Sequence, residues 1–141
     1  MARIESGVST VSGFGAFAGK KYLNLESYRK NGGAVRTPVW FAADPSTSLD
    51  STDAKLYIYT TGDSGKVKRI RNNDSVKIAP CNARGDLQGE WVGARAEIVT
   101  GNEAVHGTSL LNKKYMPWKQ LLNFFAMFRP RERVVFLIRP A

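Results

Sequence analysis

A β-hairpin is predicted at residues 22–43, which read YLNLESYRKNGGAVRTPVWFAA. Apolar and polar residues alternate over residues 22–28, as expected of a strand with one buried face. An Asn-Gly-Gly turn follows at residues 31–33, and its glycines accept the positive φ angles that tight hairpin turns require. Residues 34–43 form the return strand. Because Pro38 in its middle donates no backbone hydrogen bond, this strand is predicted to lie at a sheet edge or to bulge there.

The rest of the chain continues this hairpin with further short strands and two helical regions. Strands are predicted at residues 55–61, 76–81, 89–100 and 133–139. A two-turn helix is predicted over residues 65–71, and a longer helical region after residue 102, divided at Pro117. The apolar stripe of that second region consists of Leu111, Tyr115, Trp118, Leu122 and Phe125. This order favours a mainly β fold, a barrel or half-open barrel capped by helices, over a doubly wound parallel sheet.

The chain is predicted to be a single domain, residues 1–141, that begins with a loose N-terminal arm. No linker-like change of composition and no internal repeat divides it. Residues 1–20 are rich in glycine and serine, with at most a short helix near residues 15–20. The segment Gly13–Ala18 matches the dinucleotide-binding pattern GxGxxA, but nothing strand-like precedes it. It is therefore interpreted as part of the flexible arm.

Charge and composition restrict the possible functions. The chain has 21 lysines and arginines against 12 acidic residues, a net charge of +9, which favours an anionic partner. A single histidine, His106, and a single cysteine, Cys81, exclude multi-histidine or cysteine-cluster zinc sites and an intrachain disulfide. The uncharged runs are too short or too rich in serine and glycine to cross a bilayer. We expect a cytoplasmic protein that does not associate with membranes.

The densest basic segment, residues 66–71, follows a strand end that carries hydroxyl groups. Tyr59, Thr60 and Thr61 end the strand, a small turn follows, and Lys66 stands in the first turn of the predicted helix. Backbone N–H groups and the helix dipole favour an anion at such a position, and a lysine adds a full charge. The pattern predicts a phosphate site, although the spacing is not that of a P-loop. The alternative is a basic helix whose charges are simply solvated.

Two further features allow a functional and a structural interpretation. The edge strand at residues 36–40 can offer free backbone groups and the Thr37 hydroxyl to a planar ring, or Trp40 can belong to the core. Arginines at positions 129, 131, 133 and 139 follow several phenylalanines, which is typical of a nucleic-acid surface. Exposed charges are equally expected around a turn and a strand start, and no nucleic-acid partner is predicted.

Together these segments resemble the pyridoxamine 5′-phosphate oxidase-like split-barrel flavoproteins, most closely their short deazaflavin-dependent branch. The resemblance covers most of the chain. It rests on YLNLESYRKNGGAVRTPVWF (22–41), KLYIYTTGDSGKVKRIRNN (55–73), VKIAPCNARGDLQGEWVGARAEIV (76–99), LLNKKY (110–115) and RERVVFLIRP (131–140).

The resemblance implies a six-stranded antiparallel split barrel that forms a homodimer, with the cofactor between subunits. The cofactor-binding residues it implies are Arg36, Thr37, Pro38, Val39, Trp40, Tyr59, Thr60, Thr61, Ser64, Lys66 and Arg69. The first five correspond to the strand along the isoalloxazine ring, the next three to the strand end at the ribityl and phosphate groups, and the last three to the phosphate grip. Oxidase members carry Arg-Lys where this chain has Gly65-Lys66, so Arg69 is the expected replacement for the missing arginine.

We therefore expect an oxidoreductase in which deazaflavin coenzyme F-420 carries hydride to an unidentified small, electron-poor substrate. F-420 has a phosphodiester and an oligoglutamate tail, and a basic protein attracts such a polyanion. The alternatives are an FMN-binding relative of pyridoxamine 5′-phosphate oxidase and a non-catalytic haem-, biliverdin- or flavin-binding protein on the same fold. Vitamin B6 oxidation is not expected, because its substrate-recognition residues have no counterpart here. No side chain is predicted to act as a catalytic acid or base, and no metal site is predicted.

Overall fold

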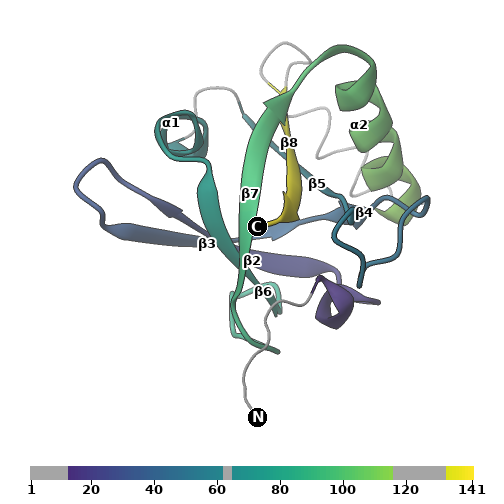
Figure 1. Ribbon diagram of the computed structural model, residues 1–141, viewed down its shortest axis with the longest axis horizontal. Coiled ribbons are helices and arrows are strands. Elements are labelled where there is room, and N and C mark those ends of the chain that lie inside the picture. Colours follow the sequence, from purple (N-terminus) through teal and green to yellow (C-terminus); the bar gives the residue numbers. More distant parts are fainter. Residues whose placement is uncertain (1–12, 62–64, 116–132) are drawn as a thin grey trace.

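The computed structural model describes residues 13–61, 65–115 and 133–141. The strands are β2 (Tyr22–Tyr28), β3 (Ala34–Trp40), β4 (Ala42–Ala43), β5 (Leu56–Thr61), β6 (Ser75–Cys81), β7 (Val92–Val99) and β8 (Arg133–Pro140). The helices are the 3-10 turn η1 (Gly15–Phe17), α1 (Gly65–Asn72) and α2 (Gly101–Tyr115). Figure 1 shows α1 and α2 on opposite sides of the curled sheet.

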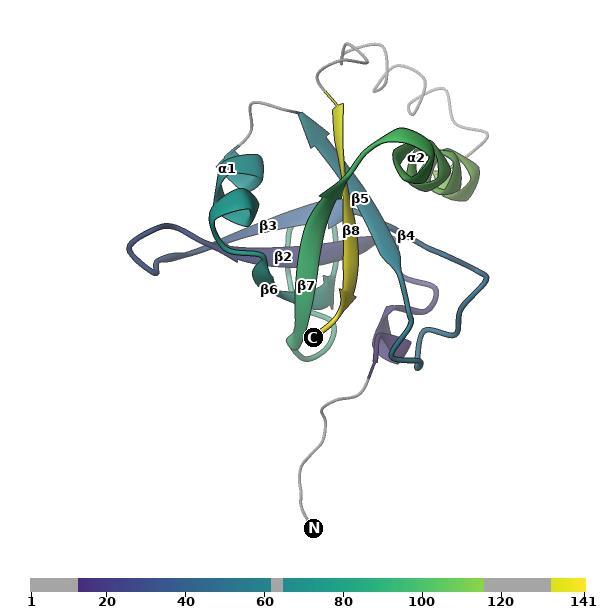
Figure 2. The same cartoon turned by 45° about the horizontal axis from the view of Figure 1, so that its top comes forward.

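All strands belong to one antiparallel sheet in the order β3-β2-β6-β7-β8-β5-β4. Its two outermost strands, β3 and β4, are separated in the chain by Phe41 alone. The segment 34–43 therefore pairs with β2 through its first part and with β5 through its end, and the sheet must curl round to allow this. Figure 2 shows the result, with β2 and β3 running across β5, β7 and β8. The predicted antiparallel half-barrel with capping helices is confirmed.

The strand count is seven rather than the expected six. The predicted return strand, residues 34–43, is interrupted at Phe41 and so divides into β3 and β4. The predicted position of Pro38 is confirmed, since β3 is the outermost strand of the sheet and Pro38 lies opposite Asn24 of β2. Because no strand lies on the outer side of β3, the missing N–H of Pro38 breaks no hydrogen bond between strands on that side.

Two apolar clusters hold the sheet and helices together. The larger fills the inside of the curled sheet, where α1 adds Val67 and Ile70 to buried residues of β2, β5, β6, β7 and β8 and of η1. The smaller lies where α2 packs on β4, β5 and β8, and its buried residues include Tyr57 and Leu111. Of the predicted apolar stripe of the second helical region, Leu111 is therefore confirmed as a core residue. Trp118, Leu122 and Phe125 of that stripe lie outside the described residues.

The prediction of a loose N-terminal arm is wrong for residues 13–20. The rings of Phe14 and Phe17 are buried in the larger cluster, and an edge-to-face series with 5.8 Å between centroids joins Phe14 to Phe17 and Phe17 to Phe41. Gly13 serves close packing here rather than flexibility, because a Cβ at this position would lie 2.6 Å from the carbonyl oxygen of Leu49. Residues 1–12 lie outside the described residues.

Within the described ranges, no helix is both long enough and apolar enough to cross a membrane.

The packing of η1 can be tested with Phe17→Ala. Removing this fully buried ring should lower the free energy of unfolding by about 3–4 kcal/mol. Guanidinium denaturation followed by circular dichroism measures the change. Val105→Ala is the matched control, because Val105 is 68% exposed on α2 and should change stability by less than about 0.5 kcal/mol. Equally small effects of both substitutions would contradict the packing of η1 and support the prediction of a loose arm.

Candidate functional site

A cavity of about 220 Å³ lies beside the edge strand β3. Its walls come from β2, β3 and β5, and the lining residues are Tyr22, Pro38, Val39, Trp40 and Tyr59. The structure thus brings together four of the residues that were predicted to bind a cofactor. Tyr22 was not predicted among the cofactor-binding residues. The strand register places it in the cavity, because Tyr22 pairs directly with Trp40 across the β2–β3 ladder.

The cavity has two aromatic walls held in place by packing. The rings of Tyr22 and Trp40 lie 6.4 Å apart between centroids and are inclined at 47°. Trp40 and Tyr59 are half-buried and pack against the apolar cluster beneath α2. Trp40 is therefore both an outlying core residue and a cavity wall, so the two sequence interpretations are not exclusive. A shallow apolar hollow of this kind suits one face of a flat conjugated ring.

Arg36 and Thr37 do not line this cavity. The Arg36 guanidinium binds a carboxylate instead, with Nε 2.7 Å from Oε1 of Glu26, and it lies over the Trp91 ring, 4.9 Å from the centroid. Glu26 is only 5% exposed, and its second oxygen accepts a 2.6 Å hydrogen bond from the Tyr28 hydroxyl. The Tyr28 hydrogen bond and the Arg36 guanidinium hold the pKa of Glu26 below its usual value against the effect of burial. Arg36 thus neutralises a buried charge on the sheet.

A cluster of cations lies at the start of α1. Arg69 Nε donates a 2.7 Å hydrogen bond to Ser27 Oγ on β2. Burial lowers the pKa of Arg69, and the nearby charge of Arg29 lowers it further. The pKa of Lys66 is likewise lowered by burial and then by Arg69. For both groups the charged neighbour that shifts the pKa is another cation, so a bound anion would relieve this repulsion. Arg29 was missed because it stands in the hairpin turn, far from α1 in sequence.

The Arg69 guanidinium folds back toward the first residue of α1. A Cβ at Gly65 would lie 2.6 Å from Nη1 of Arg69, and the space beside the helix start is therefore taken by this guanidinium. The absence of a side chain at Gly65 and the position of Arg69 are thus structurally linked. The expected replacement of a position-65 arginine by Arg69 stays a prediction.

One chain segment connects the aromatic cavity to the cation cluster. Tyr59 lines the cavity, and Thr60 and Thr61 continue β5, paired with Val134 and Arg133 of β8. Ser64 lies outside the described residues, so its predicted role is not tested. Because a chain extends by at most 3.6 Å per residue, the Cα atoms of residues 61 and 65 lie no more than about 14 Å apart. An elongated ligand can therefore reach from one feature to the other.

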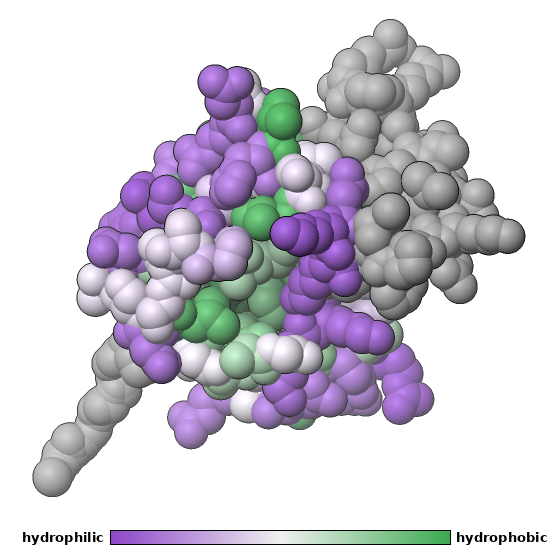
Figure 3. Space-filling view, turned by 90° about the vertical axis from the view of Figure 1, so that its right-hand side faces the viewer, coloured by the Kyte–Doolittle hydropathy of each residue, from purple (hydrophilic) through white to green (hydrophobic). Residues whose placement is uncertain are grey.

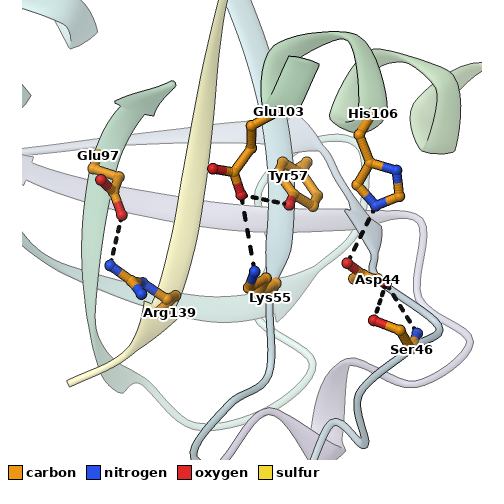
Figure 4. Close-up of polar contacts among 8 residues, drawn as sticks. All are labelled: Asp44, Ser46, Lys55, Tyr57, Glu97, Glu103, His106 and Arg139. Atoms are coloured by element: carbon orange, nitrogen blue, oxygen red, sulfur yellow. Dashed lines mark hydrogen bonds and ion pairs between the residues drawn. The ribbon is translucent and has the colours of Figure 1, made fainter. Parts of the chain in front are cut away.

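His106 belongs to a separate polar group, shown in Figure 4. Its Nε2 lies 3.2 Å from Oδ2 of Asp44, and Oδ1 of Asp44 accepts hydrogen bonds from the backbone N–H and the hydroxyl of Ser46. Burial raises the pKa of Asp44, but the bonds from Ser46 and His106 outweigh it and leave the pKa below its usual value. The Ser46 hydroxyl is bonded to the carboxylate rather than to the imidazole. This is not the order of groups in a Ser-His-acid triad.

A second polar group in Figure 4 joins α2 to β5 of the sheet. The Tyr57 hydroxyl donates a 3.0 Å hydrogen bond to Oε2 of Glu103, and Lys55 Nζ lies 3.9 Å from the same oxygen. Burial and this carboxylate raise the pKa of Tyr57. These groups hold α2 over β5, and we assign them no chemistry. Within the described ranges, no group of three or more histidine, cysteine, aspartate or glutamate side chains is placed to hold a metal ion.

Solved structures of similar fold are split-barrel proteins that are named for different functions. An F-420 reductase has a TM-score of 0.57 at 18% identity and covers 92% of this chain and 94% of its own. A candidate pyridoxamine 5′-phosphate oxidase from Listeria innocua has a TM-score of 0.57 at 13% identity, covering 85% and 83%. HutZ, a haem storage protein from Vibrio cholerae, has a TM-score of 0.60 at 10% identity, covering 87% and 83%.

At these identities the likeness establishes the fold alone. No protein-family model matches the sequence, and no curated protein sequence matches it either. The neighbours share a pyridoxamine 5′-phosphate oxidase-like split barrel, and the deazaflavin branch is one of several among them.

The role of Glu26 can be tested with Tyr28→Phe. At pH 7 this change should destabilise the fold by about 1–2 kcal/mol, since it removes a hydrogen bond to a buried carboxylate. The folded-state pKa of Glu26 is below the ordinary value of 4.5, so its ionised form stabilises the fold above that pH, and the effect is lost as the pH falls through the folded-state pKa. Urea denaturation at neutral and acidic pH should show the difference between the two proteins shrinking in acid. A constant difference would mean that ionised Glu26 is not its source.

Proposed function

We propose that this protein is an oxidoreductase that binds deazaflavin coenzyme F-420 and uses it to reduce a small, electron-poor substrate. The observation that carries the proposal is the pairing of an aromatic cavity at an edge strand with a cation cluster at the start of the next helix. Fold similarity to an F-420 reductase supports it.

The ring of the cofactor would lie along β3, against Pro38, Val39 and Trp40, with Tyr59 as the opposite wall. Because β3 is an edge strand, backbone groups along this stretch can bond to the ring without breaking a ladder. When bound, the coenzyme supplies the hydride. The described side chains would orient the ring face and exclude water, and we assign none of them the role of acid or base.

The phosphate of the cofactor would bind at Ser64, Lys66 and Arg69, beside the end of β5 at Thr60 and Thr61. Lys66 is half-buried and Arg69 is anchored through Nε on Ser27, which leaves the outer guanidinium nitrogens able to donate to a phosphate. Arg29 adds a third positive charge to the same region. A bound phosphate would reverse the repulsion among these groups.

The charge of the ligand favours F-420 over FMN. F-420 combines a phosphodiester with an oligoglutamate tail, whereas FMN has a single phosphate. A net charge of +9, with a basic helix at the proposed phosphate site, matches the more anionic cofactor. FMN remains the alternative cofactor for the same site.

The size of the cavity supports a homodimer as the working unit. At about 220 Å³ it is smaller than the 300–1,000 Å³ typical of pockets that enclose a cofactor-sized ligand. A cavity of this size would cover only part of the cofactor. We propose that a second copy of this chain covers the part that Pro38, Val39, Trp40 and Tyr59 leave exposed.

A non-catalytic haem- or biliverdin-binding protein is the second candidate, and the fold similarity to HutZ favours it. The two functions differ in what they require. Haem binding predicts a strong Soret band on titration with haemin and no turnover with reduced F-420, whereas an oxidoreductase predicts saturable F-420 binding and turnover.

The proposal can be tested by titrating the purified protein with F-420 and with FMN while following tryptophan fluorescence. Lys66→Ala should weaken binding of the preferred cofactor by about 1–3 kcal/mol, because it removes a charged partner of the phosphate. Lys68→Ala is the matched control, since Lys68 is exposed on the same helix and should leave the affinity unchanged. Saturable binding of neither cofactor would overturn the proposal, and an unchanged affinity in Lys66→Ala would assign this lysine to the solvated face.

The separation of His106 from the chemistry gives a second test. His106→Ala should leave the rate of F-420-dependent quinone reduction within about two-fold of the wild-type rate, because the imidazole is bonded to Asp44 and lines neither predicted part of the site. Steady-state assays that follow the absorbance of the reduced cofactor measure this. A loss of ten-fold or more at an unchanged melting temperature would place His106 in the reaction.

A further inference from the structure

A second, larger cavity of about 370 Å³ lies between η1, β4 and the last turns of α2. It shares no described lining residue with the cavity along β3. The residues that line it are Phe17, Ala18, Gly19, Phe41, Ala42, Ala43, Pro45, Leu49, Leu110, Lys113 and Lys114. Its volume is within the range of small-molecule sites.

The walls of this cavity are apolar and belong to rigid parts of the fold. Phe17 and Phe41 are members of the larger core cluster, and Ala42 belongs to the smaller one. The cavity therefore lies where the two clusters meet, walled by side chains that packing holds in place. Figure 3, which views the side of the molecule that carries α2, shows apolar residues gathered in a depression bordered by hydrophilic ones.

The charged groups that line this cavity are two consecutive lysines at the end of α2. Lys114 Nζ donates 2.7 Å hydrogen bonds to the carbonyl oxygens of Lys20 and Phe41, and it lies 3.7 Å from the centroid of the Phe41 ring. Burial lowers the pKa of Lys114 to about 8. Lys113 is exposed at the rim. Among the described residues of the lining there is no carboxylate to offset these charges.

We propose that this cavity binds a small amphipathic anion, an apolar chain or ring that ends in a carboxylate or a similar group. The apolar part would lie against Phe17, Phe41 and Ala42, and the anionic end would pair with Lys113 at the rim. Lys114, anchored by two carbonyl oxygens, contributes a fixed positive potential at the same end. This pairing follows from charge complementarity, since a purely apolar ligand would gain nothing from either lysine.

The site does not depend on the proposed cofactor. It uses η1 and the end of α2, whereas the cofactor would use β3, β5 and α1. A ligand in the second cavity can therefore be detected in the protein without F-420 or FMN. Lys66→Ala, which tests the cofactor site, should leave it unaffected.

The experiment compares octanoate with 1-octanol by isothermal titration calorimetry on the full chain. The two probes have the same chain length, and only octanoate is charged. Octanoate should bind about five-fold more tightly, the magnitude of a partly exposed ion pair. Lys113→Gln should weaken octanoate by a similar factor and leave 1-octanol unchanged. Lys30→Gln is the matched control, because Lys30 is exposed at the hairpin turn and should change neither affinity.

A second variant tests the location independently of charge. Ala18 is exposed and lines the cavity, so Ala18→Leu should narrow the cavity and weaken both probes without disturbing the core. Absence of saturable octanoate binding would overturn the proposal. Equal affinities for the two probes would overturn it as well, and so would octanoate binding that neither Lys113→Gln nor Ala18→Leu changes.

Discussion

The rest of the structure depends on the pairing of one chain segment with two different strands. Residues 34–40 pair with β2, and Ala42 and Ala43 pair with β5, so that segment joins the two ends of the sheet. This double pairing requires the sheet to curl. The larger apolar cluster fills the inside of the curled sheet, and the aromatic cavity lies where β2 and β3 approach β5. The pairing also brings Tyr59 of β5 close to Pro38 and Trp40, although about twenty residues separate them in the chain. Both cavities lie along this segment, the first before Phe41 and the second from Phe41 onward.

The distribution of charge separates the structural ion pairs from the candidate binding regions. On the sheet, Arg36 is paired with Glu26, Arg95 with Asp74 and Arg139 with Glu97. At the start of α1 the electrostatic neighbours of Lys66 and Arg69 are cations, and the charged groups that line the second cavity are lysines. Lys113 and Lys114 border an apolar hollow that would hold the uncharged part of an anionic ligand.

Much of the fold could be predicted because the periodicity of the chain is regular. The strand at residues 22–28, the Asn-Gly-Gly turn and the edge position of Pro38 are confirmed. The single buried face expected from the alternation is wrong, because Asn24 and Glu26 on the other face of β2 are buried as well. The N-terminal arm was misjudged as well. Glycine-rich composition predicts flexibility, but Phe14 and Phe17 are buried by Phe41 and other residues distant in sequence. A local pattern contains no information about such partners.

The candidate site divides in the same way. Pro38, Val39, Trp40, Tyr59 and Lys66 could be singled out in advance, because strand edges, hydroxyl-bearing strand ends and basic helix starts are visible in the order of residues. Arg69 was added only by the family resemblance. Tyr22 and Arg29 could not be singled out, since their places follow from cross-strand register and from the approach of the hairpin to α1. The ion pair between Arg36 and Glu26 could not be predicted either. It forms because the β2–β3 register places Arg36 opposite the buried Glu26 carboxylate. Residue order is thus sufficient for the elements and the kinds of groups they carry. Which of these groups meet follows from the closure of the sheet, because closure brings distant strands within contact distance and so selects the partners.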